Sequence, residues 1–365
     1  MSRAYNIISA DSHVFEPNDL WERYIEPAYR DRMPRVIHED GTDKWVIDGL
    51  ETRPIPLLAA SAGVKSEELT NSGEYEGVRE GGWNPDARIK DMDVDGMDAE
   101  ILYTSMFNLY RIPDPAYKMA CFRAYNNWLM DYCNAYPDRL VGIGLIALDD
   151  IEAAVQELRR ITQKGMKGAA IPCLPRMDHH YGDPRYEPFW AEAQDLDMPL
   201  SLHVNTSEDT VVPQTPEYLI NFTLFLVQIQ MSLTTLLAYG VLERFPGLKL
   251  VSAENDIGWV ATYKARLDHA YERHRFWSDT GNKLKMLPSE YVNRQAYLTF
   301  MYDKPGVDNR HHIGVDKIMW ASDYPHSDAT WPESDKFIQW QFGGLPADER
   351  RKIICDNAKA LYRMG

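Results

Sequence analysis

Asp11, Ser12 and His13 form the pattern in this sequence that most directly suggests chemistry, because they follow an apolar run, residues 5–10, near the N-terminus. Side chains of a β-strand alternate in direction, so Asp11 and His13 are expected to point to the same side. A carboxylate and an imidazole at one strand end can supply two ligands of a metal site. Asp and His also occur at strand ends for structural reasons, so the pair gains its weight from similar residues at other strand ends.

Three later apolar runs also end in residues of the types that bind metals, namely His203, Glu254, Asp323 and His326. Two imidazoles together with several carboxylates suit Zn²⁺, Mn²⁺ or Fe²⁺ better than Mg²⁺ or Ca²⁺, which prefer shells made only of oxygen. The sequence therefore predicts a site for one or two divalent ions. Its expected ligands are Asp11, His13, His203, Glu254 and Asp323.

The overall composition is that of an acidic globular protein. Of its 365 residues, 44% are hydrophobic and 26% are charged, and the formal net charge is −16. A surface of this charge repels phosphate backbones and anionic lipid headgroups, so we expect neither a nucleic acid nor a membrane as partner. The four cysteines lie far apart and the first residues show no secretory pattern, which predicts a cytoplasmic protein with reduced thiols.

The most apolar stretch of the chain covers residues 218–240. Asn221, Gln228 and Gln230 interrupt it, together with several Ser and Thr residues. Polar side chains at this frequency favour a buried helix of a folded domain over a segment that crosses a membrane.

Short apolar runs alternate with longer amphipathic stretches through most of the chain. After the first strand, further strands are predicted at residues 99–103, 140–146, 168–171, 198–203, 248–253, 296–300 and 317–321. Helices are predicted at residues 115–136, 151–164, 188–196, 216–244, 257–277, 307–312 and 346–363. This alternation indicates a parallel sheet, and eight such units predict a single (β/α)8 TIM barrel domain over residues 1–365. A doubly wound open sheet is the less favoured alternative, because no Gly-rich phosphate turn follows a strand.

An insertion, residues 14–85, separates the first strand from the rest of the barrel pattern and is rich in Pro, Gly and charged residues. Within it, residues 44–47, a tight turn at Asp48-Gly49 and residues 51–55 predict a β-hairpin. Connections that follow the strands of a barrel lie at the rim where active sites form. We therefore expect the insertion to cover the rim or to reach a neighbouring subunit, and we expect the protein to be a homodimer.

Three segments of the chain resemble the amidohydrolase-2 family. They are residues 10–17 (ADSHVFEP), 240–247 (GVLERFPG) and 320–326 (WASDYPH). This family is the branch of the amidohydrolase superfamily that includes aminocarboxymuconate-semialdehyde decarboxylase and the resorcylate decarboxylases. The resemblance covers nearly the whole chain and implies a metal-dependent (β/α)8 barrel.

The resemblance also implies roles for individual residues. By position, Asp11 and His13 match the strand-one ligands of the family, His203 the strand-five ligand, and Asp323 the strand-eight aspartate. The chain departs from many relatives in having Asp11 as the first residue of the strand-one pair and Glu254 in place of a His after strand six. Glu254 could bind the metal, act as a base, or hold a ligand His in place. A site this rich in carboxylates favours Mn²⁺ or Fe²⁺.

The expected reaction is hydrolysis or non-oxidative decarboxylation of a small, carboxylated and largely apolar cyclic substrate. An ion at such a site polarises a substrate oxygen and lowers the pKa of its water, from ~15.7 to about 7 in the best cases. Asp323 is the expected proton-transfer residue, and His326 and Glu254 are further catalytic candidates. The same ligand set serves both reactions and does not choose between them.

Two other functions remain compatible with the sequence. Glu16, Glu254 and Asp323 could complete a carboxylate site for two iron ions, which would make the protein a non-heme diiron oxygenase. A barrel that has lost its metal could also serve as a binding protein, although the presence of both His13 and His203 argues against that.

Loops at the predicted rim supply candidate substrate contacts. Phe107 and Arg111 follow the second strand and combine an aromatic surface with a cation that can pair with a substrate carboxylate. His180 lies in the polar loop after the fourth strand, on the same side of the predicted barrel. We expect these three residues to contact the substrate.

Overall fold

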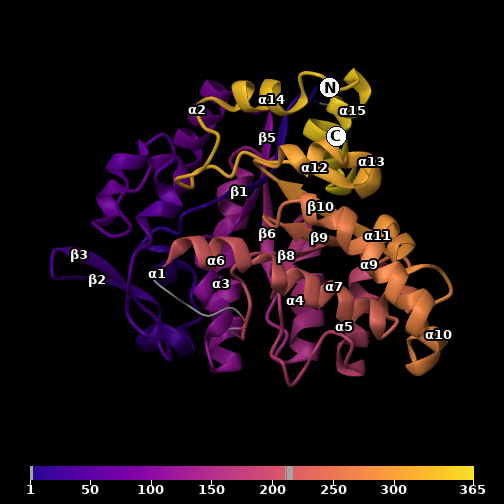
Figure 1. The fold of residues 1–365 in the computed structure, drawn as a ribbon. Helices are drawn as coiled ribbons and strands as arrows, with labels where there is room; N and C mark the ends of the chain where they lie inside the picture. The colour runs from indigo at the N-terminus through magenta and orange to yellow at the C-terminus, as the bar shows by residue number, and fades with distance from the viewer. Residues whose placement is uncertain (1–2, 210, 212–216) are drawn as a thin grey trace.

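Eight parallel strands surround a common axis in the computed structural model, which describes residues 3–209, 211 and 217–365 (Figure 1). Each strand pairs with the next one along the chain. The strands are β1 (Ile8–His13), β5 (Ala99–Tyr103), β6 (Leu140–Leu145), β7 (Gly168–Ile171), β8 (Leu200–His203), β9 (Leu250–Ala253), β10 (Ala296–Phe300) and β11 (Ile318–Trp320). Almost every strand residue is buried, as expected for a parallel sheet that helices cover. The predicted (β/α)8 barrel is confirmed, and the open-sheet alternative is wrong.

The barrel closes where the first and last strands meet. The His13 backbone N–H donates to the Tyr324 carbonyl at 2.7 Å, and the Asp323 N–H donates to the Asp11 carbonyl at 3.1 Å. Two backbone contacts thus join the end of β1 to the segment that follows β11. They bring two of the predicted metal ligands together at one point of the rim.

A register shift in β1 lies directly before the end of that strand. Relative to β5, the strand gains one residue between Ser9 and Ser12. The Ser9 hydroxyl lies 2.9 Å from the Ser12 hydroxyl and accepts a hydrogen bond of 2.8 Å from the Ser322 N–H. Irregularities of this kind re-aim side chains next to active sites. Here the extra residue lies within the segment that carries Asp11.

Helices lie outside the strands and complete the barrel (Figure 1). Their bounds are α1 (Leu20–Tyr24), α2 (Pro85–Asp95), α3 (Pro115–Asn134), α4 (Ile151–Gln163), α5 (Glu187–Asp195), α6 (Tyr218–Leu224), α7 (Leu226–Ala238), α8 (Val241–Arg244), α9 (Gly258–His274), α10 (Thr280–Lys283), α11 (Pro288–Gln295), α12 (Lys304–Asp308), α13 (Arg310–Ile313), α14 (Ser334–Phe342), α15 (Ala347–Arg351) and α16 (Asn357–Leu361). Asp114 and Asp150 cap α3 and α4 through their side chains, which explains where these two predicted helices begin.

Helix α2 was not predicted from the sequence. Its residues are mostly charged, and so they show little apolar periodicity. The ends of the helix are nevertheless well defined, because the Asn84 side chain caps its first turn, Pro85 occupies the first position and Gly96 ends it with a φ of 74°.

The predicted helix over residues 216–244 is divided into α6, α7 and α8, and its first residue lies outside the described residues. Helix α7 buries one face through Ile229, Leu233, Leu236 and Leu237, but α6 has no buried residue. The expectation of one buried helix is therefore wrong for α6. By length and composition alone, Tyr218–Ala238 could cross a membrane, with 28% of the apolar window buried. Its place between β8 and β9 is that of the connecting helices of a barrel.

The insertion after β1 forms a small antiparallel sheet that projects from the barrel (Figure 1). Its strands are β2 (Arg35–Glu39), β3 (Thr42–Val46) and β4 (Arg53–Pro54), in the order β2-β3-β4. Pairing of β3 with β4 agrees with the predicted hairpin, and the predicted turn at Asp48-Gly49 is present, since the Leu50 N–H donates to the Ile47 carbonyl at 3.0 Å. A second tight turn, at Asp40 and Gly41 with φ angles of 55° and 73°, joins β2 to β3 and was not predicted.

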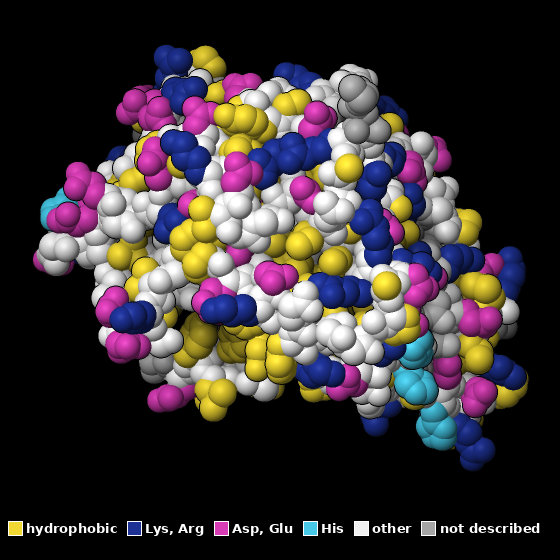
Figure 2. Space-filling model, turned by 90° about the horizontal axis from the view of Figure 1, so that it is seen from above, with side chains coloured by type: hydrophobic (Ala, Val, Ile, Leu, Met, Phe, Trp, Pro, Cys, Tyr) yellow, Lys and Arg dark blue, Asp and Glu magenta, His cyan; other side chains and the backbone are white. Residues whose placement is uncertain are grey.

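Charged side chains of both signs are scattered over the face shown in Figure 2, with hydrophobic groups between them. The net charge of −16 is therefore not gathered into one acidic patch on this face.

A fully buried arginine on α2 connects the strand ends that meet at the closure. Arg88 donates through Nε to Glu100 Oε2 at 2.5 Å and through Nη1 to the His13 carbonyl at 2.6 Å. Its guanidinium also lies over the ring of Tyr324, 4.4 Å from the centroid. Arg88 is thus bonded to β5, the end of β1 and the segment after β11, and it fixes the backbone of a predicted metal ligand.

We expect Arg88→Met to lower the free energy of unfolding by about 3–5 kcal/mol, because it leaves Glu100 as an unpaired buried carboxylate. Urea titration measures this change. Arg23→Met is the matched control, since Arg23 pairs with Asp19 on the surface and its loss is expected to cost less than about 1 kcal/mol. A loss for Arg88→Met as small as that of the control would contradict the proposed role of the buried pair.

Candidate metal centre

Five predicted ligands converge at the C-terminal ends of the strands. His13 Nε2 lies 3.6 Å from Asp11 Oδ1, 3.5 Å from Glu254 Oε2 and 3.3 Å from Asp323 Oδ1. His203 Nε2 lies 3.4 Å from Asp11 Oδ1 and 3.2 Å from Glu254 Oε2. Residues from β1, β8 and the segments after β9 and β11 therefore face one point.

The separations and chemistry of these atoms fit a metal ion. Each of the five is buried and has no hydrogen-bond partner among the described residues, although buried polar atoms are normally satisfied. Metal–ligand bonds of ~2.0–2.2 Å place neighbouring ligand atoms roughly 3.0–3.5 Å apart, close to the distances found here. The atoms form two overlapping sets that could each hold a divalent cation, one from Asp11, His13 and His203 and the other from His13, Glu254, Asp323 and His326.

Hydrogen bonds to backbone carbonyls orient both imidazoles. His13 Nδ1 lies 2.9 Å from the Thr104 carbonyl, and His203 Nδ1 lies 2.9 Å from the Val204 carbonyl. A carbonyl only accepts, so Nδ1 carries the proton in each ring and the lone pair of Nε2 faces the shared point. This is the usual arrangement of metal-binding histidines.

Thr299, near the end of β10, supports two of the carboxylate residues and was not predicted from the sequence. Its hydroxyl donates to Asp11 Oδ2 at 2.8 Å and accepts from the Glu254 N–H at 2.8 Å. The first bond leaves Oδ1 as the atom of Asp11 that faces the shared point. A polar residue near the end of the seventh predicted strand was the only available signal for this role.

Glu254 and Asp323 both adopt backbone conformations that are uncommon outside glycine. Their φ angles are 54° and 58°, in the left-handed region. Such conformations cost energy and persist where the surrounding structure enforces them, most often at functional sites. Glu254 directly follows β9 and Asp323 is the third residue after β11, and each turns the chain so that its carboxylate enters the site.

Like charges crowd around the shared point. Burial, followed by the charge of Asp323, raises the pKa of Glu254 well above its usual range. Burial also opposes the charge of Asp323, but the imidazoles of His326 and His13 hold the pKa of Asp323 below its usual range. A divalent cation among these carboxylates relieves their mutual repulsion.

His326 joins the site through Asp323. Its Nδ1 lies 3.0 Å from Asp323 Oδ2, and its ring stacks on that of His13 with centroids 4.0 Å apart. His326 Nε2 is buried and has no partner among the described residues. The residue is therefore positioned by a ligand and keeps one nitrogen available.

A cavity of about 460 Å³ opens above the shared point. Asp11, Glu254, Asp323 and His326 lie in its lining, and its walls include apolar side chains from α6, α7 and the insertion. Examples are Leu58, Phe107, Phe222, Phe225, Leu226 and Phe300. The ligands thus lie in a pocket whose remaining surface suits an apolar molecule.

The family model for amidohydrolases matches residues 48–364, most of the barrel including every ligand except those on β1. The chain belongs to the amidohydrolase family. The decarboxylases among its relatives and its cluster of metal-binding side chains identify this amidohydrolase as an enzyme.

Curated relatives share about a quarter of their residues with this amidohydrolase. Gamma-resorcylate decarboxylase of Rhodococcus jostii is 25% identical over 297 residues, which cover 76% of this chain and 87% of that enzyme. The 2-amino-3-carboxymuconate-6-semialdehyde decarboxylase of Dictyostelium discoideum is 23% identical over 248 residues and 67% of each chain.

Solved structures share the fold of this amidohydrolase along its whole length. An amidohydrolase from Mycobacterium avium subsp. paratuberculosis superposes with a TM-score of 0.80 at 22% identity, covering 99% of this chain and 100% of that one. The 5-carboxyvanillate decarboxylase of Novosphingobium aromaticivorans, complexed with manganese, superposes with a TM-score of 0.72 at 20% identity, covering 99% and 96%.

The predicted substrate contacts of the amidohydrolase do not all reach the metal cavity. Phe107 lines it and stacks on the ring of His203 with centroids 5.1 Å apart. Arg111 lines an adjoining pocket instead. His180 lies away from both, because its ring packs against Tyr239 and its Nδ1 accepts from the Gly182 N–H at 3.1 Å. The expectation for His180 is therefore not supported.

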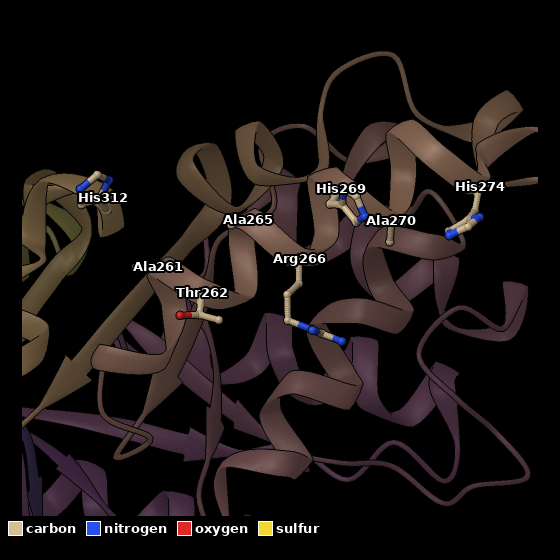
Figure 3. Close-up of a pocket in the computed structure, with 8 residues that line it drawn as sticks. All are labelled: Ala261, Thr262, Ala265, Arg266, His269, Ala270, His274 and His312. Carbon is tan, nitrogen blue, oxygen red and sulfur yellow. The ribbon is translucent and has the colours of Figure 1, made fainter.

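A larger hollow lies outside the barrel along α9 (Figure 3). Its volume is about 630 Å³, and it is open to solvent and lined by several alanines and three histidines. His312 lies at one end of the view and His274 at the other, with His269 between them (Figure 3). These histidines do not converge, so the hollow offers no ligand set comparable to that at the strand ends.

Glu16 lies beside the site but outside the ligand cluster. Its Oε1 accepts hydrogen bonds from the Thr104 hydroxyl and from the Ser105 N–H, the latter at 3.3 Å. Burial is the main reason that the pKa of Glu16 rises to about 7. A role of Glu16 as an iron ligand, which the diiron alternative requires, is therefore not supported.

We expect His203→Ala to abolish tight metal binding while the protein stays folded, because this imidazole supplies one of two neutral ligands. Elemental analysis of protein purified without chelator measures the metal content, and circular dichroism checks the fold. His38→Ala is the control, since His38 lies exposed on the inserted sheet. Metal content in His203→Ala equal to that of the control would remove His203 from the site.

We also expect Glu16 to make stability depend on pH. With a folded pKa of about 7 against 4.5 for the free group, the folded state holds the proton more tightly. The unfolding free energy of the wild type should therefore fall as pH rises from 4.5 to above 7, by on the order of 3 kcal/mol relative to Glu16→Gln. Urea titrations at pH 5 and pH 8 measure this difference. Glu76→Gln changes an exposed residue and is the control, so its unfolding free energy should depend on pH as that of the wild type does. The same pH dependence in Glu16→Gln and the wild type would contradict the prediction.

Proposed function

We propose that this amidohydrolase is a metal-dependent, non-oxidative decarboxylase of small aromatic carboxylates. The observation that carries the proposal is the convergence of five unpartnered ligand atoms in a cavity with aromatic walls. Relatives named as decarboxylases of gamma-resorcylate and of 2-amino-3-carboxymuconate-6-semialdehyde support the same reaction class. A structural neighbour named 5-carboxyvanillate decarboxylase shares the fold.

The ligand set supports a single Mn²⁺ ion as the cofactor. Three carboxylates and two imidazoles give a shell richer in oxygen than typical zinc sites, and such shells suit harder ions. Three structural neighbours carry manganese, which agrees with this choice. Asp11, His13, His203, Glu254 and Asp323 would hold the ion. When bound, it supplies positive charge that binds the substrate carboxylate or a neighbouring phenolate oxygen.

His326 and Asp323 are placed to manage the proton of the reaction. Loss of carbon dioxide breaks the bond between the ring carbon and the carboxylate, and the electron pair that stays on the carbon must take up a proton. Asp323 Oδ2 accepts a hydrogen bond from the N–H at His326 Nδ1. When the His326 ring carries two protons, the second proton is therefore on Nε2. Because Nε2 lacks a partner among the described residues, it is free to deliver that proton in the cavity.

Apolar walls orient the ring of the substrate and keep water from the reacting carbon. Phe107 already stacks on one metal-ligand imidazole, and Phe222, Phe225 and Phe300 face the same cavity. Aromatic side chains favour planar apolar ligands. The pocket therefore combines a charged end for a carboxylate with an apolar region for a ring.

We propose that the enzyme works in the cytoplasm. All four cysteines are free and buried, as suits a protein of the reducing cytoplasm.

We further propose a homodimer in which the inserted sheet contributes to the contact. Light scattering that shows a monomer at micromolar concentration would contradict this.

We expect the Mn²⁺-loaded protein to release carbon dioxide from ortho-hydroxybenzoates without oxygen. Anaerobic assays that follow carbon dioxide and the phenolic product by chromatography provide the measurement. Chelator treatment should abolish turnover, and added Mn²⁺ should restore it. Turnover that requires oxygen, or hydrolysis of amide substrates without any carbon dioxide release, would overturn the proposal.

We expect His326→Gln to reduce kcat for carbon dioxide release by ~10²–10⁴-fold, the usual contribution of a general acid–base group. Its Mn²⁺ content should stay near that of the wild type, because His326 reaches the site through Asp323. His180→Gln is the matched control and should keep full activity, since His180 lies away from the cavity. Equal activity in the two variants would exclude His326 as the proton donor.

A further inference from the structure

A second pocket of about 240 Å³ adjoins the metal cavity. The two share four lining residues, namely Pro56, Ser105, Phe107 and Asn205. The side chains of Phe107 and its neighbours therefore form a common wall, and a molecule in one pocket can extend into the other. The pair of pockets resembles a two-part binding site more than two separate ones.

The charges of the two pockets are opposite. The metal cavity is lined by five carboxylate residues and by no Lys or Arg among the described residues; the acids are Asp11, Glu254, Asp256, Asp323 and Asp328. Apart from the metal and His326, it offers nothing to balance an anion. The adjoining pocket is lined by two arginines, Arg53 and Arg111. A second anionic group on a substrate would be repelled by the metal cavity and attracted by the adjoining pocket.

Arg111 lacks a carboxylate partner within the described part of the chain. Its Nε donates to the Ser207 carbonyl at 3.2 Å, and its two terminal nitrogens have no hydrogen-bond partner among the described residues. Arg53 pairs with Glu51 at 3.2 Å on the exposed side. Burial and the charge of Arg53 lower the pKa of Arg111, so the two cations lie close enough to disfavour each other. An anion beside them would relieve this repulsion and could accept two parallel hydrogen bonds from Arg111.

The rest of the adjoining pocket is mainly apolar. Phe15, Trp45, Met106 and Phe107 line it. Glu16 also lies in the lining, but its carboxyl already accepts hydrogen bonds from Thr104 and Ser105. The pocket thus offers aromatic and aliphatic surface beside a guanidinium, which suits a second ring or a short arm that ends in an anionic group.

The size of the metal cavity also favours a ligand longer than a single ring. A cavity of ~150 Å³ is sufficient to hold a benzene ring. The metal cavity measures about 460 Å³ and the adjoining pocket adds about 240 Å³, so a single-ring acid leaves much of this space unused.

We propose that the substrate is an elongated aromatic acid with two anionic ends. The reacting carboxylate occupies the metal cavity, and the second anionic group, on an attached ring or arm, pairs with Arg111 beyond Phe107. This inference rests on the proposed decarboxylase function for the role of the metal end. The assignment of Arg111 rests on the pockets and their charges alone.

Isothermal titration of the Mn²⁺-loaded protein tests the proposal with the 3,3′, 3,4′ and 4,4′ isomers of biphenyl dicarboxylate, each compared with its matching biphenyl monocarboxylate. At least one dicarboxylate should bind tenfold or more tightly than its monocarboxylate. Arg111→Met should remove that preference and leave monocarboxylate affinity and Mn²⁺ content unchanged. Arg111→Lys keeps the charge and should retain part of the preference. Arg176→Met, an exposed site paired with Asp178, is the control and should behave as the wild type.

Each other outcome has a defined meaning. If no dicarboxylate binds more tightly than its monocarboxylate, or if none of the compounds binds, the two-ended substrate is wrong. If the preference persists in folded Arg111→Met, or is lost equally in Arg176→Met, Arg111 is not the recognising residue and the proposal fails. A preference that depends on Arg111 in a protein that releases no carbon dioxide from any aromatic acid would uphold this inference and overturn the decarboxylase function instead.

Discussion

The structure is organised around the need to hold three carboxylates close together at the base of a cavity. Asp11, Glu254 and Asp323 direct oxygens at one point, and two neutral imidazoles share it. Such an arrangement is unfavourable in a protein interior unless a cation balances the charge. The left-handed backbone of Glu254 and Asp323 and the raised pKa of Glu254 are local signs of that cost. The rest of the barrel provides the rigidity that maintains it.

That rigidity comes from a layer of hydrogen bonds directly behind the ligands. Carbonyls of Thr104 and Val204 fix the imidazoles, and the Thr299 hydroxyl joins Asp11 to the backbone of Glu254. Arg88 donates a hydrogen bond to the His13 carbonyl and so fixes the end of β1. Metal sites depend on such supporting groups for affinity and orientation. The cavity above the ligands has no Lys or Arg in its described lining, so a bound metal ion would be the main positive charge that a substrate carboxylate can reach.

The strand ends could be predicted because buried parallel strands leave a clear signal. Residues 99–103, 168–171 and 296–300 were predicted with the bounds that the structure shows, and the ligands follow from where such strands end. Helix α2 gave no such signal, since its charged residues resemble a solvent-exposed segment. Arg88 within it is fully buried only because Glu100 lies opposite on β5, which is a contact between segments. The position of Arg111 in a separate pocket likewise depends on the inserted sheet, whose path no periodic pattern fixes.

A bound ion would also strengthen the seam of the barrel, which is the junction between its first and last strands. Among the described residues, two backbone hydrogen bonds, a cluster of serine hydroxyls and the Arg88 side chain join these edges, whereas the other neighbouring strands pair through backbone ladders. Local opening of a protein begins where such support is thinnest. Because Asp11 lies on β1 and Asp323 follows β11, an ion bound to both would link the two edges of the barrel. Loss of such an ion would weaken the barrel at this junction, and amide exchange in residues 9–13 would then become faster.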